Sequence, residues 1–181
     1  MSAATPEIIY YVAASLDGYI ATPDGGIEWL APFEATGEDY GYANFYASID
    51  AVLLGRKTYE QSLSFGDWPY PGKPCWVCSR QPLAIRRPDV QVARGGPSEV
   101  AAQLSARGCR RAWLVGGGTM AGAFRAAGMI SEYIVAVIPV VLGGGIPLFA
   151  GAAPAERLTL TESKVFPNGI VQLHYLRRVT A

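Results

Sequence analysis

The chain has 181 residues, of which 50% are hydrophobic and 17% are charged, and its formal net charge is zero. This length predicts one domain over residues 1–181, with enough apolar material to bury a core. Nucleic-acid-binding proteins usually carry a basic surplus, which this composition lacks. The longest apolar runs, 133–142 and 51–54, are far shorter than the roughly 20 residues of a membrane-spanning helix. We therefore expect a protein that binds neither nucleic acids nor membranes.

Apolar runs alternate with segments of helical period along the chain. Strands are expected at 7–14, 50–54, 74–78, 90–93, 111–115 and 132–141. Helices are expected at 40–48, with Thr36 as a cap and Asp39 behind it, shortly after Gly55, at 97–106 and at 119–126. Residues 15–34, rich in Gly, Asp and Pro, are expected to form a long loop, and such loops in compact domains are usually functional. A terminal antiparallel hairpin, 158–165 with 170–176, turns at Asn168-Gly169. The pattern predicts an α/β fold with a mostly parallel, mixed sheet.

Three cysteines, an odd number, argue against a disulfide framework, and the opening MSAATPEII lacks the features of a signal peptide. We therefore expect a cytoplasmic protein. Cys75 and Cys78 form a C-x-x-C pair, but they lie in a strand-like run whose alternation directs them to opposite faces. Only Cys109 and His174 remain as further zinc ligands. We predict no metal site and buried structural thiols, with a redox or metal-binding pair as the alternative.

Three strand ends carry groups that bind phosphate. After the strand 111–115 come Gly116, Gly117 and Gly118, and a helix follows at once with Thr119 and Met120. Glycine lets a phosphate approach the backbone, and a helix N-terminus offers free N–H groups. The alternative is a tight turn that merely needs glycine. If all three strand ends meet at one edge of the sheet, they can hold one dinucleotide.

The other two strand ends contribute hydroxyl groups and cations. Gly55 is followed by Arg56, Lys57 and Thr58, although cations are disfavoured at a helix start unless an anion lies there. Ser79 and Arg80 follow the strand that ends at Cys78, and suit a monoester phosphate such as the 2′-phosphate of NADP. An exposed basic turn and an ordinary turn are the respective alternatives.

The order of these motifs resembles that of the dihydrofolate-reductase fold family. The motifs are A-x-S-L-D-G at 13–18, L-x-G-R-K-T-Y at 53–59, C-S-R at 78–80 and V-G-G-G-T at 115–119. The chain is most similar to the branch that includes the C-terminal reductase domain of the bifunctional riboflavin-biosynthesis deaminase–reductase. The run 132–149, with its proline, L-G-x-G and L-F, strengthens the likeness. The resemblance implies a three-layer fold with helices on both faces, NADPH as cofactor and a homodimer.

The resemblance also implies roles for individual residues. Ala13 and Ile20 would contact the nicotinamide, and Trp29 would flank the cofactor. The pyrophosphate and the adenosine phosphate would be held by Gly55, Arg56, Lys57, Thr58, Gly116, Gly117, Gly118, Thr119 and Met120. Ser79 and Arg80 would hold the 2′-phosphate. A cis peptide bond is expected between Gly116 and Gly117.

Two positions depart from the riboflavin-pathway pattern. Gly116 stands where those reductases have a substrate-contacting glutamate, and Ile27 stands where they have a serine. A pocket without these polar partners should bind the ribosyl-phosphate substrate poorly.

The proton donor is a carboxylate or a water molecule. Dihydrofolate reductases place a carboxylate at the helix after the first loop. Glu34 is the nearest positional candidate, with Glu28, Glu38 and Asp39 as others. Asp17 is either an acid near the nicotinamide or a turn former ahead of Gly18.

We predict an NADPH-dependent reductase that transfers a hydride to a small, flat, pterin-like or pyrimidine-like C=N or C=O substrate. The alternatives are a riboflavin-pathway reductase of the ribosylaminopyrimidine phosphate and a non-catalytic dinucleotide-binding protein. His174 is expected to have no catalytic role, because it lies away from the glycine motifs. The loop 68–71 is either a lid or an interface. The run 133–142 is apolar, and Ile146, Leu148 and Phe149 look exposed, so the segment 133–149 is predicted at or near a dimer interface.

Overall fold

The computed structural model describes residues 5–178. The first four and the last three residues of the predicted domain lie outside the described part, and these include the start of the opening segment MSAATPEII. The strands are β1 (Glu7–Ser15), β2 (Tyr19–Ala21), β3 (Ala51–Gly55), β4 (Cys75–Cys78), β5 (Val90–Ala93), β6 (Arg111–Gly116), β7 (Ile130–Ile138), β8 (Ile146–Pro147), β9 (Leu158–Val165) and β10 (Val171–Arg177). The α-helices are α1 (Ala31–Glu34), α2 (Tyr42–Ser48), α3 (Arg56–Ser62), α4 (Pro97–Ala106) and α5 (Gly118–Ala126). Two short 3-10 helices are η1 (Glu28–Leu30) and η2 (Leu63–Phe65).

Eight strands form one sheet in the order β5-β4-β3-β6-β1-β7-β10-β9. The neighbours from β5 to β7 run parallel, whereas β10 runs antiparallel to both β7 and β9. A separate two-stranded sheet joins β2 to β8. The predicted mixed sheet with a terminal hairpin is therefore confirmed.

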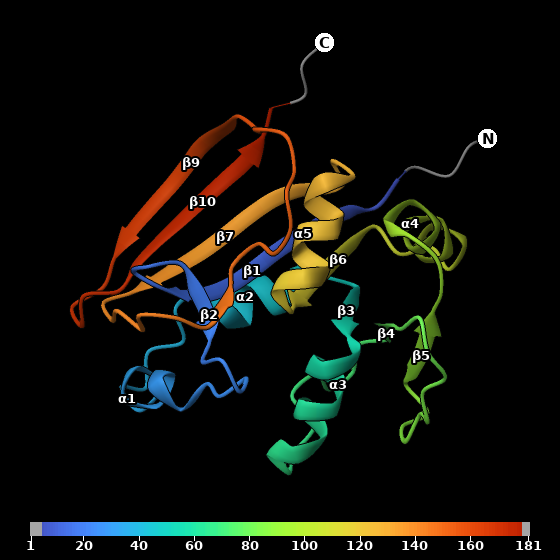
Figure 1. Cartoon of the computed structure of the whole chain (residues 1–181), viewed down its shortest axis with the longest axis horizontal. Helices are drawn as coiled ribbons and strands as arrows, with labels where there is room; N and C mark the ends of the chain where they lie inside the picture. The colour runs from blue at the N-terminus through green and yellow to red at the C-terminus, as the bar shows by residue number, and fades with distance from the viewer. Residues whose placement is uncertain (1–4, 179–181) are drawn as a thin grey trace.

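Helices cover both faces of the sheet, as Figure 1 shows. Alternate residues of each strand enter different cores: Ile8 packs with residues of α4 and α5, whereas Ile9 packs with residues of α2 and α3. A third, smaller cluster surrounds Ile138, Phe166 and Ile170. The three layers that the resemblance implied are thus present.

Some predicted boundaries were wrong. β7 ends at Ile138 rather than at residue 141, because Pro139 has no N–H for the ladder. The expected loop 15–34 contains β2, η1 and α1. α2 begins at Tyr42, and its cap is the Asp39 carboxylate, which accepts hydrogen bonds from the N–H groups of Gly41 (2.9 Å) and Ala43 (3.2 Å). The Thr36 hydroxyl instead donates to the Phe33 carbonyl.

Within residues 5–178, no helix has the length and apolar character needed to cross a membrane.

Candidate functional site

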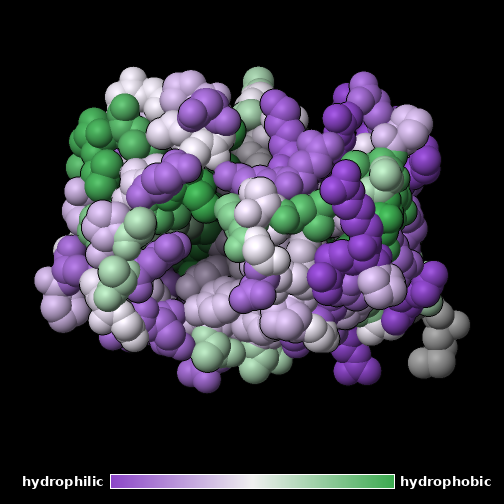
Figure 2. All heavy atoms as spheres, turned by 90° about the horizontal axis from the view of Figure 1, so that it is seen from below, coloured by the Kyte–Doolittle hydropathy of each residue, from purple (hydrophilic) through white to green (hydrophobic). Residues whose placement is uncertain are grey.

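The three motifs predicted to bind phosphate meet at one edge of the sheet, an arrangement that the sequence allowed. β3 lies between β4 and β6, with Gly55 paired to Cys78 and Leu54 paired to Gly116. The contact is close: a Cβ on Gly55 would lie 3.2 Å from the Gly116 carbonyl oxygen. Figure 2 views the molecule from the side on which α1 and α3 lie, and it shows a hollow between them with hydrophobic atoms along part of its wall.

The glycine turn between β6 and α5 contains the expected cis peptide bond, between Gly116 and Gly117. No side chain caps α5, and although the Met120 N–H donates to the Gly117 carbonyl (3.0 Å), the N–H groups of Gly118 and Thr119 remain for a ligand. A Cβ added to Gly118 would lie 2.1 Å from the Pro147 carbonyl oxygen, so packing against the 146–150 loop requires glycine there.

Gly117 differs from its neighbour. Its φ of −85° is open to any residue, and a Cβ would meet only the Thr58 hydroxyl oxygen, at 3.9 Å. The fold alone therefore does not require glycine at this position. The bare space lies between an uncapped helix start and a threonine hydroxyl for which the structure records no hydrogen bond. A phosphate group fits this setting, because both sides offer donors to it.

Cations gather beside this edge. The side chains of Lys57 and Arg80 are exposed and have no ion-pair partner among residues 5–178. Arg56 is less available than predicted, because its guanidinium donates to Glu60 Oε1 (2.8 Å) and to Gln81 Oε1 (2.5 Å). The Ser79 hydroxyl donates to the Gln81 carbonyl (2.8 Å) and so shapes the same turn.

An open cavity of about 450 Å³ adjoins the cations, between α3 and residues 82–86. Arg56, Tyr59 and Arg86 are among its lining residues. The cavity is thus bordered by Arg56, one of the predicted phosphate-binding residues, and by Glu60, whereas Ser79 and Arg80 are not among its lining residues.

The predicted nicotinamide residues come from three different elements. Ala13 of β1 and Trp29 of η1 pack in the same cluster, together with Phe33, whereas Ile20 lies on β2. The indole nitrogen of Trp29 is buried and has no hydrogen-bond partner within the described chain. An unpaired buried N–H is costly, so this donor suits a ligand.

Asp17 has a structural role that the acid interpretation did not foresee. Its carboxylate accepts hydrogen bonds from the Ser15 hydroxyl (2.6 Å), the Leu142 N–H (3.1 Å) and the Gly143 N–H (2.7 Å). These hydrogen bonds, that of Ser15 first, hold the pKa of Asp17 below its usual value. An ionised carboxylate has no proton to give at neutral pH, so the structure favours the turn-former interpretation over the predicted catalytic acid.

The other carboxylates near the first loop differ in availability. Glu34 ends α1 with an exposed side chain, and Asp39 is engaged as the cap of α2. Of the four candidates, Glu34 keeps both a suitable chain position and a carboxylate for which the structure records no hydrogen bond.

The loop 68–71 packs on the core of its own chain through two of its aromatic rings, while Pro71 is exposed. The Trp68 ring contacts the rings of Tyr59 and Tyr70, and Tyr70 is buried. Likewise Ile146 pairs in β8, and Phe149 packs against Tyr10 and Tyr133. Ile146, Leu148 and Phe149 are half-buried, so the expectation that they are exposed was wrong.

The two cysteines of the C-x-x-C pair lie on opposite faces of β4, as predicted. Cys75 packs in the core beneath α2 and α3, whereas Cys78 packs against the core beneath α4 and α5. Burial raises the pKa of each thiol to about 12. Among residues 5–178 there is no cluster of three or more His, Cys, Asp or Glu side chains that could hold a metal ion.

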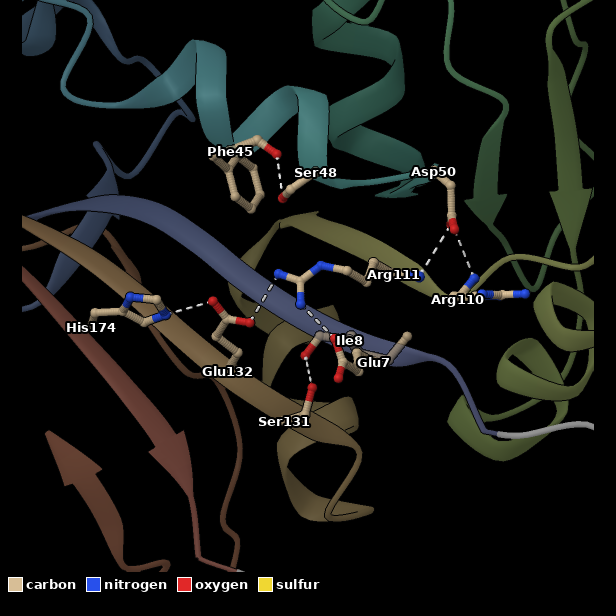
Figure 3. Close-up of polar contacts among 10 residues, drawn as sticks. All are labelled: Glu7, Ile8, Phe45, Ser48, Asp50, Arg110, Arg111, Ser131, Glu132 and His174. Atoms are coloured by element: carbon tan, nitrogen blue, oxygen red, sulfur yellow. Dashed lines mark hydrogen bonds and ion pairs between the residues drawn. The ribbon is translucent and has the colours of Figure 1, made fainter. Parts of the chain in front are cut away.

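His174 takes part in a charged network on β10, β7, β6 and β1, which Figure 3 shows. Its Nε2 lies 2.5 Å from Oε1 of Glu132, a buried residue, and the other oxygen of that carboxylate accepts from Arg111 (3.2 Å). Arg111 also donates to Glu7 (2.5 Å). Because Glu7 and Arg111 begin their strands, the network lies at the opposite end of the parallel strands from the glycine turn.

Sequence reasoning missed Tyr40 and its partners on the β9–β10 hairpin, which belong to the same cluster as Ala13 and Trp29. No local pattern marks them, because they meet only in the folded chain.

Comparison with known proteins agrees with this geometry. Residues 6–172 match the RibD C-terminal domain. The chain is 40% identical over 172 residues to "Uncharacterized protein YwjB" of Bacillus subtilis (strain 168), which covers 94% of this chain and 98% of that protein. It superposes with a TM-score of 0.88 on the crystal structure of a "Putative riboflavin biosynthesis protein" from Shewanella sp. PV-4, at 30% identity over 96% of this chain and 99% of the other.

A more distant structure shares the fold. Dihydrofolate reductase from Enterococcus faecalis, complexed with NADP(H), is 16% identical and superposes with a TM-score of 0.70 over 97% of this chain and 98% of its own. These likenesses confirm the predicted dihydrofolate-reductase-like fold, and the family match supports the predicted class, a reductase of the riboflavin-pathway type. The chain belongs to the RibD C-terminal domain family.

Proposed function

We propose that this protein is an NADPH-dependent reductase of a small, flat C=N or C=O substrate. The observation that carries the proposal is the space at Gly117, which the fold leaves open beside the uncapped start of α5 and the Thr58 hydroxyl. When bound, NADPH would supply the hydride. The protein's own contribution would be to hold and orient two rings at the edge of the sheet.

The residues at this edge divide into three groups along the cofactor. Gly116, Gly117, Gly118, Thr119 and Met120, with Gly55 and Thr58, would hold the pyrophosphate. Lys57, Ser79 and Arg80 would hold the 2′-phosphate, with Arg56 in a lesser role because Glu60 and Gln81 already engage it. Ala13, Ile20 and Trp29 would border the nicotinamide.

The proton for the reduced substrate would come from Glu34 or from water. Among residues 5–178, Glu34, like Glu28, has a carboxylate with no recorded hydrogen bond, and its exposed place at the end of α1 makes it the nearer positional match. We favour Glu34 over Asp17 because three hydrogen bonds stabilise the ionised form of Asp17.

A second candidate is reduction of the ribosylaminopyrimidine phosphate in riboflavin synthesis. The family match and the name of the Shewanella relative favour it. Gly116 and Ile27 argue for a different substrate, because neither supplies the polar side chain that the resemblance requires at its position.

NADPH absorbance followed across a panel of pterins, pyrimidines, including the ribosylaminopyrimidine phosphate, and quinones tests these proposals. Oxidation with an unphosphorylated pterin or pyrimidine supports the first, and oxidation with the ribosyl phosphate alone supports the second. Tight NADPH binding without oxidation of any panel member would contradict both and favour a dinucleotide-binding protein. We also propose a cytoplasmic location, which the three free cysteines support.

A further inference from the structure

Tyr40 is the one residue other than glycine with a positive φ (53°) among residues 5–178. This left-handed conformation favours glycine, and a bulky aromatic residue adopts it only where its surroundings impose it. Gly41 follows with a φ of 80°, and α2 begins at Tyr42. The chain therefore turns sharply at Tyr40 as it leaves the first loop, and a strained aromatic residue at such a place calls for a reason.

The hydroxyl group of Tyr40 joins two distant segments. It donates to the Phe33 carbonyl of α1 (2.8 Å) and accepts from Nδ2 of Asn168 (2.6 Å), which lies in the turn between β9 and β10. The Thr36 hydroxyl is 2.9 Å away. α1 and the hairpin turn lie at the same end of the sheet (Figure 1). One phenol thus ties α1 to the terminal hairpin.

Two further contacts hold Tyr40 in place. Its ring packs edge-on against Phe166, with centroids 4.9 Å apart, and Phe166 is buried. Its carbonyl accepts from Nε2 of Gln172 in β10 (3.2 Å). Because the ring, the hydroxyl and the carbonyl are all fixed by the hairpin, the hairpin accounts for the unusual backbone of Tyr40.

The segment that Tyr40 holds has little else to secure it. Neither η1 nor α1 contains a fully buried residue, and α1 is only four residues long. Trp29 and Phe33 are half-buried against the cluster around Phe166. This segment carries both Trp29, with its unpaired N–H, and Glu34, so its position decides where these two groups lie.

We infer that Tyr40 is a positioning residue that fixes the wall of the reductase site formed by residues 28–34 to the terminal hairpin. The inference rests on the proposed function for its effect on turnover, but not for its effect on the segment itself. Tyr40 does not touch the phosphate-binding edge and acts through Trp29 and Glu34. Without the Tyr40 hydroxyl, the wall can move away from the position that binds substrate. Fewer molecules then have a binding-competent site, and the apparent substrate affinity falls in proportion.

The test compares Tyr40→Phe with a matched control, Tyr46→Phe. Both variants remove one tyrosine hydroxyl that donates to a backbone carbonyl, since Tyr46 donates to Pro71 (3.0 Å) on the far side of α2. We expect Tyr40→Phe to accelerate hydrogen exchange of the peptide 29–36 by about tenfold, the effect of losing one or two hydrogen bonds. Tyr46→Phe should leave that peptide unchanged.

Kinetics then connect the wall to the site. Tyr40→Phe should raise KM for the reducible substrate about fivefold, with kcat within about twofold of wild type, and should raise the NADPH dissociation constant by a smaller factor, because only Trp29 of this wall is assigned to the cofactor. Asn168→Ala, which keeps the bond to Phe33, should produce a smaller change in the same direction, and it replaces Tyr40→Phe if that variant does not fold.

Two outcomes overturn the inference. If the hydrogen-exchange rate of residues 29–36 in Tyr40→Phe equals that in Tyr46→Phe, Tyr40 does not hold the segment. If Tyr40→Phe accelerates hydrogen exchange of this segment but leaves KM unchanged, the segment has no influence on the substrate site. If wild type reduces no panel substrate, the proposed function fails, while the exchange experiment, with NADPH binding as its site readout, still decides whether Tyr40 holds the wall.

Discussion

Gly117 and Gly118 are neighbours in the chain, but they are glycine for different reasons. A Cβ on Gly118 would collide with the Pro147 carbonyl oxygen, whereas a Cβ on Gly117 would contact only the Thr58 hydroxyl. Packing of the chain therefore explains Gly118, while Gly117 is explained by the ligand we propose. Asp17 illustrates the reverse case, because a residue with the chemistry of an acid is fully used in holding a loop.

Replacing Gly117 by alanine should abolish NADPH binding and leave the fold intact, because the new methyl group would fill the space for the pyrophosphate. Gly118→Ala should instead lower the thermal midpoint, because its Cβ would lie 2.1 Å from a backbone oxygen. Calorimetric titration with NADPH and thermal unfolding of both variants separate the two effects. Normal NADPH binding by Gly117→Ala would show that the turn is only structural.

Arg80→Ala should narrow the preference for NADPH over NADH by about 1–3 kcal/mol, the range for a charge-assisted contact to a phosphate. Lys57→Ala should act in the same direction. Arg107→Ala, at the exposed end of α4, is the control and should change neither affinity. The measurement is the ratio of the two dissociation constants, and equal affinities of wild type for NADPH and NADH would contradict the assignment.

Asp17→Asn should lower stability at neutral pH and leave the pH dependence of kcat unchanged. Because folding lowers the pKa of Asp17, its contribution is present above the unfolded pKa of about 3.8 and disappears as pH falls through the lower folded value. The stability difference between the variant and wild type should therefore shrink only in strong acid. A shifted pH profile of kcat in Asp17→Asn would restore the acid interpretation.

At the scale of elements, β4 shows how strand alternation decides the chemistry of a motif. Cys75 and Cys78 are close in sequence, but the strand sends their side chains into different cores. Neither thiol can therefore reach the other, and both become part of the packing on either side of the sheet.

The native protein should resist alkylation at both cysteines. With a pKa of about 12 for each thiol, the thiolate fraction at pH 8 is about a thousandfold below that of an ordinary cysteine. Mass spectrometry after iodoacetamide treatment should find Cys75 and Cys78 unmodified in buffer and modified in urea. Rapid alkylation of Cys75 or Cys78 in the folded protein would instead support a redox role for the pair.

At the scale of the whole molecule, the β9–β10 hairpin carries exposed apolar side chains at the edge of the sheet. Residues that pair across the hairpin share one face, as Val165 does with Val171 and Leu160 does with Tyr175, and the Tyr175 end of this face packs against the core that includes residues of α5. Leu160 is 50% exposed and Val165 is 74% exposed on the edge strand, a degree of exposure that suits self-association. We propose a homodimer that uses this face and the adjoining β7, in place of the loop 146–149, which packs on its own chain.

Wild type should show the mass of a dimer by light scattering at micromolar concentration. Val165→Lys should shift it to a monomer, because a charge would then face the partner. Glu162→Lys is the control, since Glu162 pairs with His174 and therefore lies on the opposite face of the same strand. If wild type is a monomer, or if both variants become monomers to the same extent, this face is not the dimer interface.

The sequence by itself determined the features that depend on near neighbours. Alternating apolar residues predicted the strands, and glycines at strand ends predicted the turns. The sequence also placed candidate phosphate-binding groups after three strand ends, whereas the sheet order β4-β3-β6 decided that the Gly55, Ser79 and Gly116 segments meet. The order of these local motifs was also sufficient to identify the fold family.

Only the tertiary structure decided what individual polar groups do. The Asp17 carboxylate accepts hydrogen bonds from the backbone of Leu142 and Gly143, which lie 125 and 126 positions later in the chain. The Asn168 amide donates to the hydroxyl of Tyr40, 128 positions earlier. Such partners leave no local pattern, because each belongs to an element with its own periodicity. The hydrogen bonds of Asp17 and Tyr40, and the exposure of apolar residues on β9, depend on how those elements pack, and therefore they emerge only in the folded chain.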